Sequence, residues 1–422
     1  MDYYFIISGL VCIAALFGYI NARFLKLPIT IGLMLITIVY TLVVLGISFF
    51  DDTLLKAEAE LIQQIDFEKV LMDYMLSFLL FAGALHTNFQ ELKQQRWPVI
   101  AFATLGVITS TFLIGTLTYY LLPLLGLPTA YIYCLLFGAI ISPTDPIAVL
   151  GILKKANAPK KLEIKIVGES LFNDGVGVVL FLTIFKIASM GADAMTPADI
   201  AILFGQEVFG GIALGIILGL ITYKLLKTID DFSIEVIITL AAVMMGTVIA
   251  QKLHLSAPLA MVMAGLLIGH DRVRGSAMSE ITELYLDKFW ELIDILLNAI
   301  LFVLIGMEIL VLTYSTSYVL AGLIAIPLVL FSRYAALWLP VKLFERKLDF
   351  VPNTHLILTW GGLRGGISIA LALSLAPEMN RELFLVMSYI VVVFSILGQG
   401  LTIEKVIRRF LGKSGEKQTQ VL

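Results

Sequence analysis

The stretch ISPTDPIAVLG, residues 141–151, lies inside an apolar run, yet it sets prolines on either side of Thr144 and Asp145. Pro143 and Pro146 lack a backbone N–H, and each ring clashes with the preceding turn, so this spacing favours an unwound break over a regular helix. At membrane depth, a break is tolerated only where it lines a cavity or is covered by protein. The stretch predicts a broken helix with the Asp145 carboxylate beside freed carbonyls. The alternative is a kinked helix in which Asp145 caps a half-helix.

The composition of the whole chain places this stretch in a membrane. Hydrophobic residues make up 59% of the chain and charged residues only 14%, unlike a soluble domain. The apolar runs lack the alternating pattern of barrel strands. Because a spanning helix needs ~20 apolar residues, we predict an all-α integral membrane protein with about 13 transmembrane helices. The predicted spans are residues 2–22, 28–50, 69–87, 97–124, 128–152, 162–188, 200–226, 234–252, 255–270, 288–313, 317–344, 354–376 and 382–410.

Basic residues gather in alternate connections between these spans. Because cytoplasmic loops carry an excess of lysine and arginine, the odd-numbered spans are predicted to end in the cytoplasm. We expect the N-terminus outside and the C-terminus inside, in the inner (plasma) membrane of the cell. The basic residues are Arg23, Lys26, Lys93, Arg96, Lys154, Lys155, Lys160, Lys161, Lys165, Lys224, Lys227, Arg272, Arg274, Lys342, Arg346, Lys347, Arg408, Arg409, Lys413 and Lys417.

The connections between the spans are too short to form a soluble domain. We expect a transmembrane domain over residues 1–411 and a short cytoplasmic tail over residues 412–422. The two cysteines lie inside apolar runs, so no disulfide, metal framework or cofactor is expected. Near the start of the tenth span, Glu291 and Asp294 are interpreted as structural residues at the membrane interface.

The sixth span carries the polar motif GESLFNDG inside an apolar helix. At about 100° per residue, Ser170 and Asp174 lie on one stripe of the helix. Glu169 and Asn173 lie on a second stripe, so the two carboxylates are expected to have different tasks. Asn173 is predicted to hydrogen-bond to the broken fifth span, while Ser170 and Asp174 face the cavity. Gly177 allows a neighbouring backbone to come close to the same helix.

Two arginines lie at membrane depth in the eleventh and twelfth spans. Arg333 is alone in an apolar helix, and an unpaired buried guanidinium is costly, so it needs a carboxylate. Glu169 is the predicted partner. Arg364 lies in TWGGLRGG, whose four glycines predict a second break. We expect the Arg364 cation to compensate carbonyls and helix dipoles at that break; the alternative is a surface arginine that snorkels.

The broken fifth and twelfth spans predict an inverted repeat, as in secondary transporters. Spans 1–6 and 8–13 form two six-helix repeats, and the seventh span joins them. Because the first span runs inward and the eighth runs outward, the repeats are antiparallel. The two breaks should therefore cross near the middle of the membrane.

These motifs together resemble one family of transporters. PTDP in the fifth span, GESLFNDG in the sixth, the helix of Arg333 and GGLRGG in the twelfth are similar to the cation/proton antiporters, in particular their electroneutral NhaP- and NHE-like branch. The resemblance covers about residues 1–410. It implies a homodimer, with a dimerisation part from spans 1–3 and 7–10 and an ion-transporting core from spans 4–6 and 11–13.

The resemblance also implies roles for individual residues. Asp174 matches the aspartate that binds the ion, and the electrogenic branch has two adjacent aspartates where this chain has Asn173 and Asp174. The missing carboxylate implies that one proton is exchanged for one monovalent cation, without net charge movement. The implied ligands of Na⁺ are Asp174, Asp145, Ser170 and the backbone of Thr144, supported by Asn173, Arg364 and the buried ion pair of Glu169 with Arg333.

The chemistry of these side chains agrees with cation/proton exchange. Na⁺ and Li⁺ are hard cations that prefer oxygen ligands, and burial of a carboxylate favours its protonated form. Cation and proton would therefore compete for Asp174, and a core that moves only when loaded would couple their gradients. We expect a secondary active antiporter, not an enzyme. Its partners would be monovalent cations, protons and the lipid bilayer, and no nucleic acid.

Two alternatives use the same residues. Oxygen ligands do not fix the size of a cavity, so a potassium/proton antiporter of the same fold is the second candidate. An intramembrane aspartyl protease would use Asp145 and Asp174 as a dyad that shares a proton. Such proteases carry a GxGD sequence, which is absent here, and a protease would leave Arg333 and the paired breaks unexplained.

Overall fold

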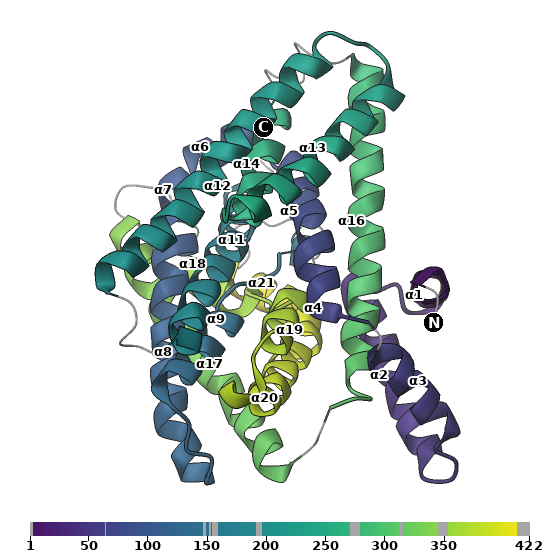
Figure 1. The fold of residues 1–422 in the computed structure, drawn as a ribbon, viewed down its shortest axis with the longest axis vertical. Coiled ribbons are helices and arrows are strands. Elements are labelled where there is room, and N and C mark those ends of the chain that lie inside the picture. The colour runs from purple at the N-terminus through teal and green to yellow at the C-terminus, as the bar shows by residue number, and fades with distance from the viewer. Residues whose placement is uncertain are drawn as a thin grey trace.

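The computed structural model describes residues 3–63, 65–146, 149–151, 153, 159–190, 196–270, 279–312, 315–344 and 353–411. In these ranges the regular structure is helical, and the one strand-like pairing is an isolated bridge. The predicted tail, residues 412–422, lies outside the described residues. Figure 1 shows the helices as a tall bundle, with α16 running along one edge.

The helices follow the predicted spans. Among the described residues, nine helices are long and apolar enough to cross a membrane, and shorter apolar helices lie in the fifth and ninth spans. The predicted all-α membrane fold is confirmed. The bounds are α1 Tyr3–Ile20, η1 Asn21–Leu25, α2 Ile29–Ser48, α3 Thr53–Gln63, α4 Phe67–Lys69, η2 Val70–Met75, α5 Leu76–Leu85, α6 Phe89–Gln94, α7 Arg96–Ala101, η3 Phe102–Gly106, α8 Val107–Leu121, η4 Leu122–Leu125, α9 Tyr131–Ile141, α11 Lys160–Met190, α12 Pro197–Leu226, α13 Phe232–Lys252, α14 Ala257–Ile268, α16 Glu280–Glu308, α17 Thr316–Phe344, α18 Thr354–Gly361, α19 Gly366–Leu373, η6 Pro377–Met379, α20 Arg381–Val393, η7 Phe394–Gln399 and α21 Gly400–Leu411.

Both predicted breaks are present. The first half of the fifth span, α9, ends at Ile141, and the chain then runs without helical structure through Pro146. In the twelfth span, α18 ends at Gly361 and α19 begins at Gly366. The two breaks lie against each other, because the residues between the half-helices form an isolated antiparallel bridge. The crossing expected from the prolines and glycines is therefore confirmed.

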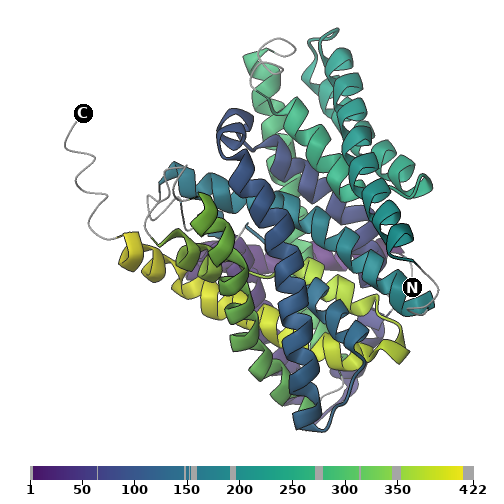
Figure 2. The ribbon, with the colours of Figure 1, turned by 90° about the vertical axis from the view of Figure 1, so that its left-hand side faces the viewer.

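The helices pack in two groups (Figures 1 and 2). In one group, α14 packs between α12 and α5, and α16 packs on α5, α2 and α1. In the other group, α8 packs on α9 and α17, and α20 packs on α17 and α19. Figure 2 shows α8, in blue, running beside α17, in green. α11 contacts both groups, since it packs on α9 and also on α12 and α14.

α11 passes directly against the broken fifth span. A Cβ atom at Gly177 would collide with the ring of Pro143, so only glycine allows this approach. The close approach predicted for Gly177 is confirmed. In the second turn of the helix, Lys165 is completely buried, so its assignment to the basic connection after the fifth span is wrong.

Candidate ion-binding site

The break after α9 satisfies its backbone through two different neighbours. Two N–H groups remain between the prolines, those of Thr144 and Asp145. The amide of Asp145 donates to the carbonyl of Leu363 at 2.8 Å, across the crossing. The amide of Thr144 donates to Oδ1 of Asn173 at 3.4 Å. Because both donors have a partner, the unwound segment can stay buried without the cost of an unsatisfied amide.

α11 holds the side chain and the carbonyl of Thr144 as well. Asn173 Nδ2 donates to Thr144 Oγ1 at 2.8 Å, so the predicted tie between Asn173 and the broken span is confirmed. The hydroxyl of Ser170 donates to the Thr144 carbonyl. The expectation that Ser170 is left to face the cavity is therefore wrong for this structure: its hydroxyl is turned to the break. Thr144 is therefore hydrogen-bonded by residues from both stripes of α11, Ser170 from one and Asn173 from the other.

Arg364 lies in the second break, and its side chain reaches the first. Its Nε donates to the carbonyl of Ile141, the last residue of α9, at 2.6 Å, and its Nη1 donates to the carbonyl of Gly362. Arg364 is only 3% exposed, so the alternative of a snorkelling surface arginine is wrong. The cation satisfies carbonyls that the two interrupted helices leave without partners, as predicted.

A network in the last span supports the second break. The backbone N–H of Arg364 donates to Ser395 Oγ at 2.9 Å, and Ser395 Oγ donates to Gln399 Oε1 at 2.8 Å. Gln399 Nε2 donates in turn to the carbonyl of Trp360 at 2.9 Å. Both polar residues belong to the π-helical segment η7, a form often found at functional sites. Neither residue was predicted from the sequence, although two polar residues four positions apart in an apolar span are a signal that could have revealed them.

Glu169 and Arg333 form the buried ion pair predicted from the sequence. Nη1 of Arg333, on α17, lies 2.8 Å from Oε1 of Glu169, and their side chains are 5% and 2% exposed. Arg333 also donates to the carbonyl of Leu358, at 3.4 Å, so it ties α11 and α17 to α18. Each charge compensates the other in a place where neither is reached by solvent.

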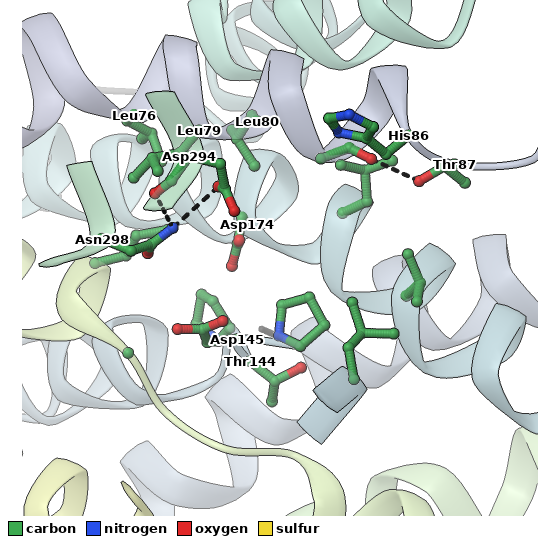
Figure 3. Close-up of a pocket in the computed structure, with 18 of the residues that line it drawn as sticks. Leu76, Leu79, Leu80, His86, Thr87, Thr144, Asp145, Asp174, Asp294 and Asn298 are labelled. Atoms are coloured by element: carbon green, nitrogen blue, oxygen red, sulfur yellow. Dashed lines mark hydrogen bonds between the residues drawn. The ribbon is translucent and has the colours of Figure 1, made fainter. Parts of the chain in front are cut away.

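Asp174 lies at the wall of a cavity of about 300 Å³ that also contacts Asp145 and Thr144. Figure 3 shows the carboxylates of Asp174 and Asp145 facing the same space, one on α11 and one on the break. Asp174 is 7% exposed, and within the described part of the chain its side chain makes no hydrogen bond or ion pair. A volume of this size holds several water molecules, at ~30 Å³ each. The cavity therefore gives water and small ions access to a buried carboxylate.

Asp294 of α16 lines the same cavity. Its Oδ1 accepts a hydrogen bond from Asn298 Nδ2 at 3.0 Å, and Asn298 also lines the cavity. Asp294 therefore borders the cavity of the candidate site, a position that its interpretation as a structural interface residue did not include, whereas Glu291 is exposed and pairs with Lys288 at 2.7 Å. The spacing of four residues between Asp294 and Asn298, which puts both on one helix face, was the signal that could have revealed it.

Comparison with known proteins identifies the family. A family model described as "sodium/hydrogen exchanger, transmembrane" matches residues 11–409. The chain belongs to the sodium/hydrogen exchanger family. The match spans both groups of helices and both breaks of this exchanger, and the resemblance inferred from its four motifs is confirmed.

Relatives of this sodium/hydrogen exchanger extend over nearly its whole length. The Na(+)/H(+) antiporter NhaP of Pseudomonas aeruginosa is 49% identical over 418 residues, which are 98% of each chain. The Na(+)/H(+) antiporter NhaH of Halobacillus dabanensis is 33% identical over 392 residues, 92% of this chain and 93% of the relative. The solved structure of the sodium proton antiporter MjNhaP1 from Methanocaldococcus jannaschii at pH 8 has a TM-score of 0.75 at 20% identity, and covers 98% of this exchanger and 100% of that chain. This last similarity shows the fold.

Proposed function

We propose that this sodium/hydrogen exchanger is a secondary active antiporter that exchanges Na⁺ or Li⁺ for H⁺ across the inner cell membrane. The observation that carries the proposal is Asp174, a buried carboxylate without a hydrogen bond or ion pair among the described residues, at the wall of a cavity beside the crossing. Support comes from relatives named as Na(+)/H(+) antiporters, at 49% and 33% identity over nearly the whole chain.

Competition for Asp174 would couple the two ions. A bare carboxylate at membrane depth costs several kcal/mol, and either a proton or a cation removes most of that cost. Bound Na⁺ would take oxygen ligands from Asp174, Asp145 and the Thr144 carbonyl, which the Ser170 hydroxyl holds in place. The charged empty site is the costly form, so the core moves when it carries one ion or the other. Each gradient then drives the opposite flow.

The proposed stoichiometry rests on the family resemblance at position 173. Both ends of the Asn173 amide hydrogen-bond to Thr144, so this side chain holds the break without contributing a charge. We propose that one proton exchanges for one monovalent cation and that no net charge moves. An aspartate at this position would add a second titratable group next to Asp174.

Alternating access would use the two groups of helices. The dimerisation part comprises spans 1–3 and 7–10, with α5, α12, α14 and α16, and the moving core comprises spans 4–6 and 11–13, with the crossing. Packing within each group supports this division. The proposed homodimer has its N-terminus outside and its C-terminus in the cytoplasm, in line with the basic residues of alternate connections.

A dye measurement tests the proposal. Proteoliposomes that contain a pH-sensitive dye are given Na⁺, Li⁺ or K⁺, with the membrane potential clamped or free and with Asp174→Asn protein as the control. Na⁺ and Li⁺ should move protons through the wild-type protein only, and no potential should develop. A response to K⁺ alone would keep the mechanism and overturn the substrate. If none of the three cations caused proton movement, the proposal of antiport would be overturned.

A further inference from the structure

We propose that Asp294 of α16 is a third carboxylate that binds the transported cation, and that Asn298 positions it. The proposal rests on the proposed function and adds a ligand from the opposite group of helices. Asp174 and Asp145 belong to the predicted core, whereas α16 packs on α5, α2 and α1. The cation would therefore be held between two parts of the protein that move relative to each other.

Asp294 is held in place for this task. Asn298 Nδ2 donates both to Asp294 Oδ1, at 3.0 Å, and to the Asp294 carbonyl, at 2.8 Å. The first bond holds the carboxylate and the second anchors the same amide to the helix backbone, so the carboxylate is oriented relative to its own helix. Asn298 is itself 2% exposed, so the clamp is packed in the protein and not loose at the surface.

The three carboxylates converge on one space. Figure 3 shows the carboxylates of Asp294 and Asp174 next to each other in the view, with Asp145 below them, and all three residues line the cavity. A separate observation on Asp174 indicates that this space receives a ligand. Asp174 is 7% exposed, and its side chain has no hydrogen bond or ion pair within the described residues. Three converging acidic groups around a hydrated cavity repel one another unless protons or cations lie between them.

The position of Asp294 on α16 also links cation binding to the state of the transporter. Glu91 of α6 and Lys160 and Glu163 of α11 line the same cavity as Asp174 and Asp294, and the Lys160 side chain is exposed, so the cavity reaches the protein surface at this end. Beyond it, Leu301 of α16 packs directly onto Gly366, the first residue of α19. Movement of the core along α16 would change the position of Asp174 relative to Asp294, so the two would no longer line one cavity. Asp294 should therefore strengthen cation binding only from the side of the membrane that the cavity faces, here called the cavity side.

The Asp294→Asn variant removes the charge and keeps an oxygen that can accept the Asn298 hydrogen bond. We expect the KM for Na⁺ to rise about tenfold on the cavity side, the effect of losing one partly hydrated carboxylate near a cation, while kcat changes by less than about twofold. Everted and right-side-out membrane vesicles measure the two sides separately. Asp294→Glu should restore most of the affinity. Glu291→Gln, an equal loss of charge one turn away on the exposed face, is the matched control and should leave KM unchanged.

Sodium-dependent thermal stabilisation of the purified protein measures binding without transport. Stabilisation in the wild type that weakens in Asp294→Asn but not in Glu291→Gln supports the inference, even if exchange is absent and the proposed function fails. Wild-type exchange with the same KM in both variants overturns the inference and keeps the function. An equal rise of KM from both sides of the membrane would also overturn it, because it would indicate a general structural effect. A wild type that neither binds nor exchanges Na⁺ overturns both.

Discussion

The two faces of α11 place the same chemical group in opposite circumstances. Glu169 and Asp174 lie five residues apart in one helix, and both are more than nine-tenths buried. Glu169 has its charge compensated by Arg333 at 2.8 Å, whereas Asp174 has no ion pair within the described residues and borders a cavity. A buried carboxylate with a permanent partner stabilises the fold, and one without a partner can receive a transient partner. The surroundings, not the residue type, decide which of the two is available to an ion.

The largest effect is expected from removing the charge on the cavity face. Asp174→Asn keeps the size of the side chain and deletes the only charge at that position, so exchange should fall to the background of protein-free vesicles. The free energy of unfolding should change by less than about 1 kcal/mol, because no described hydrogen bond or ion pair is lost. Dye-monitored proton movement tests the loss of exchange, and thermal unfolding in detergent tests the unchanged stability. Retained exchange would remove Asp174 from its proposed role.

Removing the charge of Glu169, on the opposite face of α11, should lower stability and leave exchange intact. We call this face the structural face. Glu169→Gln leaves Arg333 buried without its counter-ion, which costs about 3–5 kcal/mol of folding stability. Protein that remains folded should still exchange cations for protons, with Asp174 unaltered. The double variant Glu169→Leu with Arg333→Met should recover much of the stability, since removing both charges avoids a stranded guanidinium. Thermal unfolding of the three proteins measures this, and a single variant as stable as the wild type would contradict the structural role.

The same comparison explains what the sequence reveals. Pro143 and Pro146 act on their own neighbours in the chain, so the break in the fifth span is predictable from local chemistry. The pairing of Glu169 with Arg333 is predictable for a different reason: a lone buried arginine needs a carboxylate, and few candidates exist. Both inferences use a cost that is visible in the sequence itself.

Other features depend on which helices become neighbours. The stripe that carries Ser170 is readable from the helical period, but whether its hydroxyl meets the cavity or the Thr144 carbonyl depends on tertiary packing. Asp294 lies far along the chain from Asp174, and its position in the cavity follows from how α16 packs beside the crossing. Ser395 likewise acquires its function only through the N–H of Arg364.

The smallest effect is expected from Asn173, which lies on the stripe of Glu169 but acts on the ion site. Asn173→Ala removes the partners of the Thr144 amide and hydroxyl, so the free energy of unfolding should fall by about 1–3 kcal/mol. The Thr144 carbonyl would then be held by Ser170 alone, and the KM for Na⁺ should rise a few-fold, while exchange remains electroneutral because no charge has changed. Thermal unfolding, the Na⁺ dependence of dye quenching and a potential-sensitive dye test these three outcomes. An unchanged KM together with reduced stability would place Asn173 wholly with Glu169 on the structural face, and would show that the ion site does not depend on how the break is held.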